Sequence, residues 1–124
     1  MKITAVDLYE VNVPDRHWAW SDDDFGMPSH RKTHDVVVVL RTDGGVDGYG
    51  ELSLCGLDRA TVATVVEDWI GINPLTQSQV SQETVAAGAF ECAVLDIRGK
   101  VLGCPVSELL GGAVRDRVAV TLCT

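Results

Sequence analysis

Residues 89–112 read AFECAVLDIRGKVLGCPVSELLGG, and this stretch carries the clearest structural pattern in the chain. Its apolar residues recur at helical spacing behind a candidate N-cap at Ser81, which predicts a helix over 81–102. Gly103 and Pro105 follow directly, and this combination ends helices. The buried stripe of the helix is expected to consist of Ala86, Ala89, Phe90, Ala93, Ile97 and Val101.

A shorter helix is predicted on each side of this one. The first begins at Asp58, a candidate N-cap, and ends at Gly71, with Pro74 beyond it. Its apolar residues recur at i, i+3, i+4 and i+7, namely Val62, Val65, Val66 and Trp69. The other covers Pro105–Leu110, because proline is accepted in the first turn of a helix, and the two glycines that follow break it.

Three strands are predicted ahead of the helices. Ile3–Val13 alternates imperfectly between apolar and polar residues and ends at Pro14. Asp35–Arg41 is apolar on both faces, which indicates a central strand. Thr42–Gly45 reads as a hairpin turn, and the chain returns along Val46–Leu52. Together these segments predict a three-stranded antiparallel sheet followed by a helical bundle, which is an α+β fold.

A further apolar stretch, Val118–Cys123, predicts a strand that is buried on both faces. The three strands before residue 53 already account for a sheet. The last strand therefore either joins that sheet or belongs to another domain.

Composition and charge exclude several classes of protein. The chain has 124 residues, of which 46% are hydrophobic and 23% charged. This is the mix of a globular domain and not of a disordered or low-complexity segment. The formal charge of −8 disfavours nucleic acid and anionic membrane surfaces as partners. No apolar run approaches the length of a membrane span, and the N-terminus lacks the pattern of a signal peptide.

The four cysteines form no C-x-x-C pair; they are Cys55, Cys92, Cys104 and Cys123. Zinc needs clustered ligands, and disulfides are typical of secreted, loop-rich chains. The spacing therefore favours reduced thiols and a cytoplasmic location.

Four stretches share a pattern with a known family: MKITAVDLYEV at 1–11, VVVVLRTDGGVDGYGE at 36–51, AFECAVLDIRGKVLGCPVSELLGG at 89–112 and VRDRVAV at 114–120. Together they resemble the N-terminal capping domain of the mandelate racemase and muconate lactonizing enzyme group of the enolase superfamily. Members of this group pair an α+β cap with a (β/α)7β barrel that follows it. The resemblance implies a capping domain over 1–113 and a truncated start of the barrel over 114–124, with only its first strand present. One departure is the connection between Trp69 and Ala89, which is shorter than in the family.

The resemblance also implies a reaction. Enzymes of this group abstract the proton α to a carboxylate and stabilise the enolate with Mg2+, because that proton is too weakly acidic otherwise. Their bases and metal ligands lie on barrel strands, so no catalytic residue and no metal ligand is assigned to this chain. Mg2+ and a small carboxylate substrate are expected only for the full-length parent, which would be a racemase, dehydratase or cycloisomerase. The chain alone is expected to be inactive and to have the missing barrel domain as its partner.

In this group the cap acts as a lid, through two loops that close over the barrel mouth and exclude water. The resemblance places these loops at Pro14–Thr33 and Ser53–Leu57. The candidate lid residues are Trp18, Trp20, Phe25, Met27 and His30 in the first loop, and Leu54, Cys55 and Leu57 in the second. The alternatives are local packing for the aromatic residues and simple solvation for His30.

Three further features have simpler interpretations than a binding site. Asp22–Asp24 lies near histidines but lacks the ligand spacing of a calcium loop. The glycine-rich stretch 42–50 precedes a strand and not a helix, which indicates a turn rather than a phosphate site. Asp96 is expected to pair with Lys100 at i+4, with a contact between cap and barrel as the alternative.

A second function stays open at this point. The chain could be a free-standing α+β interaction domain that oligomerises through the apolar strand at 118–123. A homo-oligomer is compatible with either function. The two differ in whether a barrel follows residue 124 in the parent.

Overall fold

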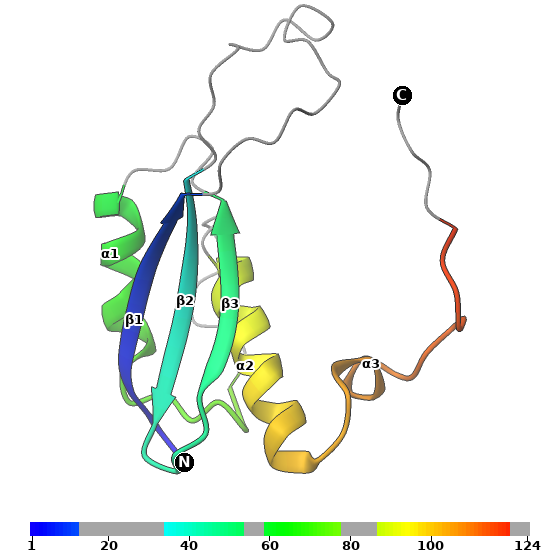
Figure 1. Cartoon of the computed structure of the whole chain (residues 1–124). Helices are drawn as coiled ribbons and strands as arrows, with labels where there is room; N and C mark the ends of the chain where they lie inside the picture. Colours follow the sequence, from blue (N-terminus) through cyan, green and yellow to red (C-terminus); the bar gives the residue numbers. More distant parts are fainter. Residues whose placement is uncertain (13–33, 54–58, 78–86, 120–124) are drawn as a thin grey trace, which may run out of the picture.

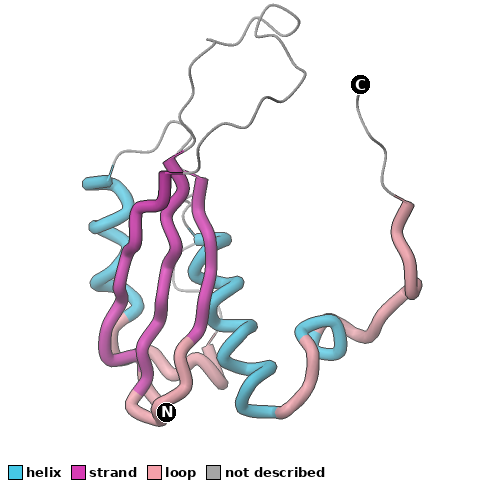
Figure 2. Tube along the Cα trace, viewed as in Figure 1, coloured by secondary structure: helices cyan, strands magenta, loops and turns pink. Residues whose placement is uncertain are grey.

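The computed structural model describes residues 1–12, 34–53, 59–77 and 87–119. In chain order the elements are β1 (Ile3–Asn12), β2 (His34–Thr42), β3 (Gly48–Ser53), α1 (Arg59–Trp69), α2 (Ala87–Leu102) and α3 (Val106–Leu109). Figure 1 shows α1 beside β1 and α2 beside β3, and Figure 2 shows the same arrangement by secondary structure. The α+β class expected from the sequence is confirmed.

The sheet has the order β1-β2-β3, and both neighbouring pairs are antiparallel. The central position of β2 confirms the prediction from its apolar residues. Its register places Leu8 of β1 opposite Val38, and Val38 opposite Gly50 of β3. Val38 and Leu40 are fully buried. Because side chains alternate along a strand, these two residues share the face that the helices cover.

The turn between β2 and β3 is longer than predicted. The return strand was expected from Val46, but β3 begins at Gly48. The Thr42 hydroxyl donates to the Val46 carbonyl at 2.7 Å and accepts from the Val46 N–H at 3.2 Å. This side chain therefore takes both backbone groups of Val46 and keeps the residue out of the ladder. Gly45, at φ 72°, makes the left-handed bend inside the turn.

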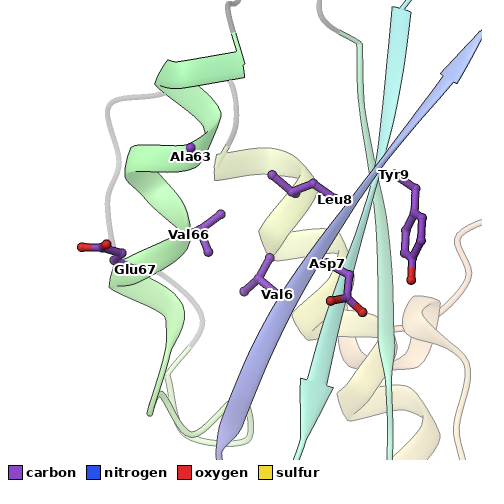
Figure 3. Close-up of a pocket in the computed structure, with 7 residues that line it drawn as sticks. All are labelled: Val6, Asp7, Leu8, Tyr9, Ala63, Val66 and Glu67. Atoms are coloured by element: carbon purple, nitrogen blue, oxygen red, sulfur yellow. The ribbon is translucent and has the colours of Figure 1, made fainter.

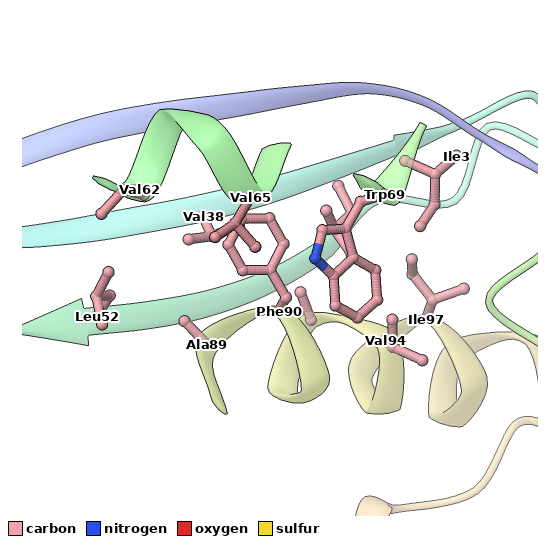
Figure 4. Packing of buried hydrophobic residues seen from close by; sticks show 12 residues of the cluster. Ile3, Val38, Leu52, Val62, Val65, Trp69, Ala89, Phe90, Val94 and Ile97 are labelled. Carbon is pink, nitrogen blue, oxygen red and sulfur yellow. The ribbon is translucent and has the colours of Figure 1, made fainter. Parts of the chain in front are cut away.

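The hydrophobic core lies between the sheet and the two longer helices. Trp69 of α1 stacks on Phe90 of α2 with ring centroids 5.2 Å apart and an interplanar angle of 13°, as Figure 4 shows. The fully or nearly fully buried members of the cluster are Ile3, Val38, Leu40, Leu52, Val62, Val65, Trp69, Ala89, Phe90, Ala93, Val94 and Ile97. Both predicted helical stripes therefore supply the core, since burial of such side chains is the main favourable term in folding.

Six residues were predicted to form the buried stripe of α2. Four of them are buried, one is exposed, and Ala86 lies outside the described residues. Ala89, Phe90, Ala93 and Ile97 are buried, whereas Val101 is 39% exposed. Val101 lies in the last turn of α2. Val94 is buried although the prediction omitted it. Ser81–Ala86, the predicted start of this helix, lies outside the described residues.

Two glycines of β3 let α2 approach the sheet closely. A Cβ added at Gly48 would lie 2.1 Å from the Ala93 carbonyl oxygen, and one added at Gly50 would lie 1.9 Å from the Ala89 carbonyl oxygen. No side chain fits at either position while the helix stays in place. The predicted return strand Val46–Leu52 already includes both glycines, although the glycine-rich stretch 42–50 was also interpreted as a turn. The structure confirms the strand at both positions, where the glycines accommodate the helix backbone.

The helix ends follow the predicted signals. Gly71, at φ 84°, follows α1, and Gly103, at φ 67°, follows α2. Pro105 precedes α3 with a φ of −67°, and the helix ends before Gly111 and Gly112. Of the strand predicted at 118–123, the structure describes only Val118 and Ala119. Neither is in a strand, and Val118 is 74% exposed.

Candidate functional site

Both predicted lid loops start from the same end of the sheet. The first leaves β1 after Asn12 and re-enters β2 at His34, and these two residues are paired across the strands. The second leaves β3 after Ser53, which is opposite Asp35 of β2. Figure 1 shows this end at the top of the view, with the start of α1 beside it. The register of the sheet therefore brings the bases of two loops that are far apart in sequence together.

The candidate lid residues themselves lie outside the described residues. This applies to all eight, Trp18, Trp20, Phe25, Met27, His30, Leu54, Cys55 and Leu57. Their assignment to a lid stays a prediction. The described structure contributes the platform from which both loops extend.

The platform is held together along β3 by polar contacts from α2. The Tyr49 N–H, on the edge of β3, donates to Asp96 Oδ2 at 3.0 Å. Lys100 Nζ donates to the same carboxylate oxygen at 2.7 Å and to the Asp47 carbonyl at 2.7 Å. The same ammonium lies 4.5 Å from the centre of the Tyr49 ring. The predicted pairing of Asp96 with Lys100 is confirmed, and the same carboxylate oxygen also binds the Tyr49 N–H.

A second charged cluster joins β1, β2 and the turn on the opposite face of the sheet. Arg41 Nε donates to Asp7 Oδ2 at 2.9 Å, and its terminal nitrogen is paired with Asp47. These two carboxylates, Asp7 first, raise the pKa of Arg41 above its ordinary value. Because two carboxylates already neutralise the guanidinium, Arg41 is a poor receptor for an anionic substrate. We interpret the cluster as a structural tie.

The described residues offer little chemistry of their own. In ranges 1–12, 34–53, 59–77 and 87–119, no three His, Cys, Asp or Glu side chains gather as they would around a metal ion. Cys92 and Cys104, the two cysteines within these ranges, are free. No described helix has the length and apolar character needed to cross a membrane.

The sequence analysis did not predict that Gly48 and Gly50 of β3 contact the backbone of α2. The sequence does contain a pattern that indicates this contact. Two glycines at alternate positions of a strand share one face, and Ala89 and Ala93 are four apart on a helix. Matching stripes of small residues on a strand and a helix indicate a close backbone contact.

The comparisons with known proteins agree with this architecture. The family model for the mandelate racemase/muconate lactonizing enzyme N-terminal domain matches residues 9–111. The chain is 30% identical to cis-3-hydroxy-L-proline dehydratase from Roseibium aggregatum, over 97% of this chain and 37% of that protein. It is 31% identical to N-succinyl-L-Arg/Lys racemase from Bacillus cereus, over 98% of this chain and 36% of that protein.

Solved structures give the same result. Muconate lactonizing enzyme from Pseudomonas putida matches with a TM-score of 0.71 and 30% identity, over 94% of this chain and 34% of that one. A protein of the mandelate racemase/muconate lactonizing type from Roseovarius nubinhibens, complexed with magnesium, matches with a TM-score of 0.77 and 22% identity, over 97% of this chain and 35% of that one. At this lower identity the second match supports the fold alone.

The chain therefore belongs to the mandelate racemase/muconate lactonizing enzyme family of the enolase superfamily, and it corresponds to the N-terminal domain of that family. It spans a little over a third of the length of the two curated relatives. The alignment to the dehydratase extends over 139 residues although this chain has 124, so the relative carries residues that have no counterpart here.

Proposed function

We propose that this chain is the capping domain of a Mg2+-dependent enzyme that abstracts the proton α to a carboxylate. The observation that carries the proposal is the shared base of the two predicted lid loops at one end of the sheet. A lid must close as a unit to exclude water from a reacting enolate, and loops rooted side by side on paired strands are arranged for that purpose. The family membership of the chain supports the reaction class.

The cap contributes positioning and exclusion of water, not bond chemistry. Mg2+, when bound in such an enzyme, stabilises the negative charge that develops on the carboxylate oxygens. Following the family to which the chain belongs, we place the metal and the bases on the barrel. In the proposed division, 1–113 form the cap and 114–124 begin the barrel, and the chain alone is inactive. The substrate is a small carboxylate, and the location is the cytoplasm.

The first experiment asks whether the parent has this activity. The parent enzyme and the 124-residue chain are incubated with a panel of small carboxylates in 2H2O, with and without Mg2+, and α-proton exchange is followed by NMR. We expect exchange only with the parent and only with Mg2+. Exchange by the 124-residue chain alone, or a parent with no Mg2+-dependent exchange on any carboxylate, would contradict the proposal.

The lid assignment has its own test in the same parent. Replacing residues 18–27 by the corresponding loop of a relative with another substrate should change the ratio of kcat/KM values between carboxylates. The matched control replaces the β2–β3 turn, residues 43–47, which lies at the other end of the sheet. If the loop exchange leaves substrate preference unchanged, the lid assignment is wrong.

The alternative of a free-standing interaction domain predicts a different result. Size-exclusion chromatography with intact mass would then show a 124-residue natural product that forms oligomers. Removal of residues 114–124 would make it monomeric.

A further inference from the structure

Two consecutive glycines after α3 have a left-handed backbone. Gly111 has a φ of 102° and Gly112 has a φ of 96°, a range that residues with a side chain rarely adopt. A Cβ added at either position would meet nothing within 4 Å. Glycine is therefore required here by the backbone conformation and not by crowding, in contrast to the two glycines of β3.

The end of α3 accounts for the first of these glycines. The Gly112 N–H donates to the Ser107 carbonyl at 2.8 Å, and the Gly111 N–H donates to the Glu108 carbonyl at 3.1 Å. This pair of hydrogen bonds is a Schellman motif, in which the residue at the position of Gly111 is left-handed. The motif does not require the same conformation of the following residue, so the positive φ of Gly112 has another cause.

The end of α2 shows the same motif without a second left-handed glycine. Gly103, at φ 67°, is its left-handed residue, and the Cys104 N–H donates to the Gly99 carbonyl at 3.0 Å. Cys104 has the position after α2 that Gly112 has after α3. Because a residue with a side chain completes the motif there, we attribute the conformation of Gly112 to the path of the chain that follows it.

The short helix α3 is anchored to the body of the cap. Val6 and Leu8 of β1 point toward α1 in Figure 3, and α2 packs against β3. Near the end of α2, a Cβ added at the buried Gly99 would lie 2.9 Å from the Cys104 carbonyl oxygen and 3.7 Å from Cγ2 of Val106, the first residue of α3. Because α2 and α3 approach each other this closely, α3 belongs to the packed body of the cap.

Beyond Gly112 the chain leaves this body. Residues 113–119 are all exposed, and within the part of the chain that the structure describes they make no backbone–backbone hydrogen bond. Figure 1 shows the segment leaving α3 on the α2 side of the molecule and running toward the end of the sheet from which both predicted lid loops start. Its direction is therefore set at Gly112, the last residue that is hydrogen-bonded to α3.

We propose that Gly112 is a positioning residue, which sets the orientation of the cap relative to the barrel of the parent enzyme. This inference rests on the proposed function, under which the chain continues into a barrel after residue 113. With an ordinary backbone at Gly112, the chain would leave α3 in another direction, and the predicted lid loops would be displaced from the barrel mouth. A misplacement of about 1 Å at a remote position can lower a reaction rate by about a hundredfold.

The test compares Gly112→Ala and Gly112→Asn in the parent enzyme. Asparagine is larger than alanine but adopts left-handed conformations more readily. We expect Gly112→Ala to lower kcat/KM for Mg2+-dependent α-proton exchange by about tenfold. It should also change the ratio of kcat/KM values between carboxylates of different size, because the lid covers the far end of the substrate. Gly112→Asn should retain more of the activity and of the original ratio in spite of its larger side chain.

Gly45→Ala is the matched control. Gly45 has a φ of 72°, a Cβ there would meet nothing within 4 Å, and it lies in the β2–β3 turn, away from the exit of the chain. Its substitution strains the backbone of the cap but should leave the ratio between carboxylates unchanged. A second measurement needs no activity: Gly112→Ala should lower the Tm of the parent by about 3 °C. The Tm of the 124-residue chain should change by less than about 1 °C, because the exposed segment after Gly112 can change direction there without losing contacts.

Three outcomes would overturn the inference. The first is a Gly112→Ala parent with unchanged Tm and unchanged kcat/KM ratios. The second is a Gly45→Ala parent whose kcat/KM ratios change as much. The third is a Gly112→Asn parent that is less active than Gly112→Ala, since the effect would then follow side-chain size and not φ. A parent that exchanges α-protons equally well with every residue at 112 refutes the positioning role while the proposed function stands. If the parent shows no exchange at all, the proposed function fails, and a Tm loss confined to the parent would still support the positioning role.

Discussion

Substitution of Gly50 by alanine tests the contact on which the platform depends. The added Cβ would lie 1.9 Å from the Ala89 carbonyl oxygen, whereas ordinary contacts begin at 3.4 Å. The obstacle is helix backbone and not the flexible end of a side chain. To relieve the overlap, α2 and β3 must separate by roughly 1.5 Å, because a packed interior has no free space to absorb the methyl group.

The energetic cost follows from what α2 carries. Phe90, Ala93, Val94 and Ile97 are buried against the sheet and α1, so moving the helix loosens all four at once. Overpacking of this kind costs about 1–3 kcal/mol, and more where backbone must move. We expect a loss of about 3 kcal/mol, which lowers the Tm by roughly 10 °C for a domain of this size. A loss of this size is a large part of the stability of a typical domain, about 5–15 kcal/mol.

The assay is urea unfolding and thermal melting of the 124-residue chain, followed by circular dichroism. Gly88→Ala is the control, because Gly88 lies in the first turn of the same helix and a Cβ there meets nothing within 4 Å. It should stabilise the protein by up to about 1 kcal/mol, the ordinary difference in helix propensity. If Gly50→Ala costs less than about 1 kcal/mol while the urea m value stays the same, the close contact between β3 and α2 does not exist as described.

Two further substitutions examine the core and the protected edge. Phe90→Ala removes the ring that stacks on Trp69 and should cost about 3–5 kcal/mol in urea unfolding; retention of most of the stability would mean that the stack does not organise the core. Asp96→Ala should cost about 1–2 kcal/mol and speed exchange of the Tyr49 amide. Asp96→Asn should retain more than half of that stability, because its amide oxygen still accepts from Tyr49 and the lost pair with Lys100 is an i,i+4 surface pair worth about 0.3–0.5 kcal/mol. Equal effects of the two Asp96 variants on the Tyr49 amide would show that charge, not the hydrogen bond, protects the edge.

The local elements were predictable because their signals are local. Helical spacing located α1 and α2, and the glycines and prolines that follow them marked where they end. The apolar character of both faces of Asp35–Arg41 was enough to place β2 in the centre of the sheet, since an edge strand exposes at least one polar row. The family resemblance adds the lid loops and the expected reaction.

The errors arise where two elements meet. Val101 continues the helical stripe of α2, but in the last turn of the helix it is exposed although its spacing suits burial. Val46 is a β-branched residue that suits a strand, but its N–H and carbonyl are hydrogen-bonded to the Thr42 hydroxyl instead of to a neighbouring strand. The candidate lid residues, in 18–30 and 54–57, lie outside the described residues, and their role stays a prediction that the loop exchange addresses.

By itself, the amino-acid sequence determined the kinds of element, their order and the family, because periodicity, turn residues and motif spacing are properties of neighbouring residues. Only the tertiary structure decided that Gly48 and Gly50 accommodate α2 and that Asp96 and Lys100 protect the edge of β3. Each of these depends on the distance between segments that are remote in the chain. The spacing of residues along the chain predicts which element each residue belongs to. Which backbone groups its side chain contacts depends on how the elements pack in three dimensions.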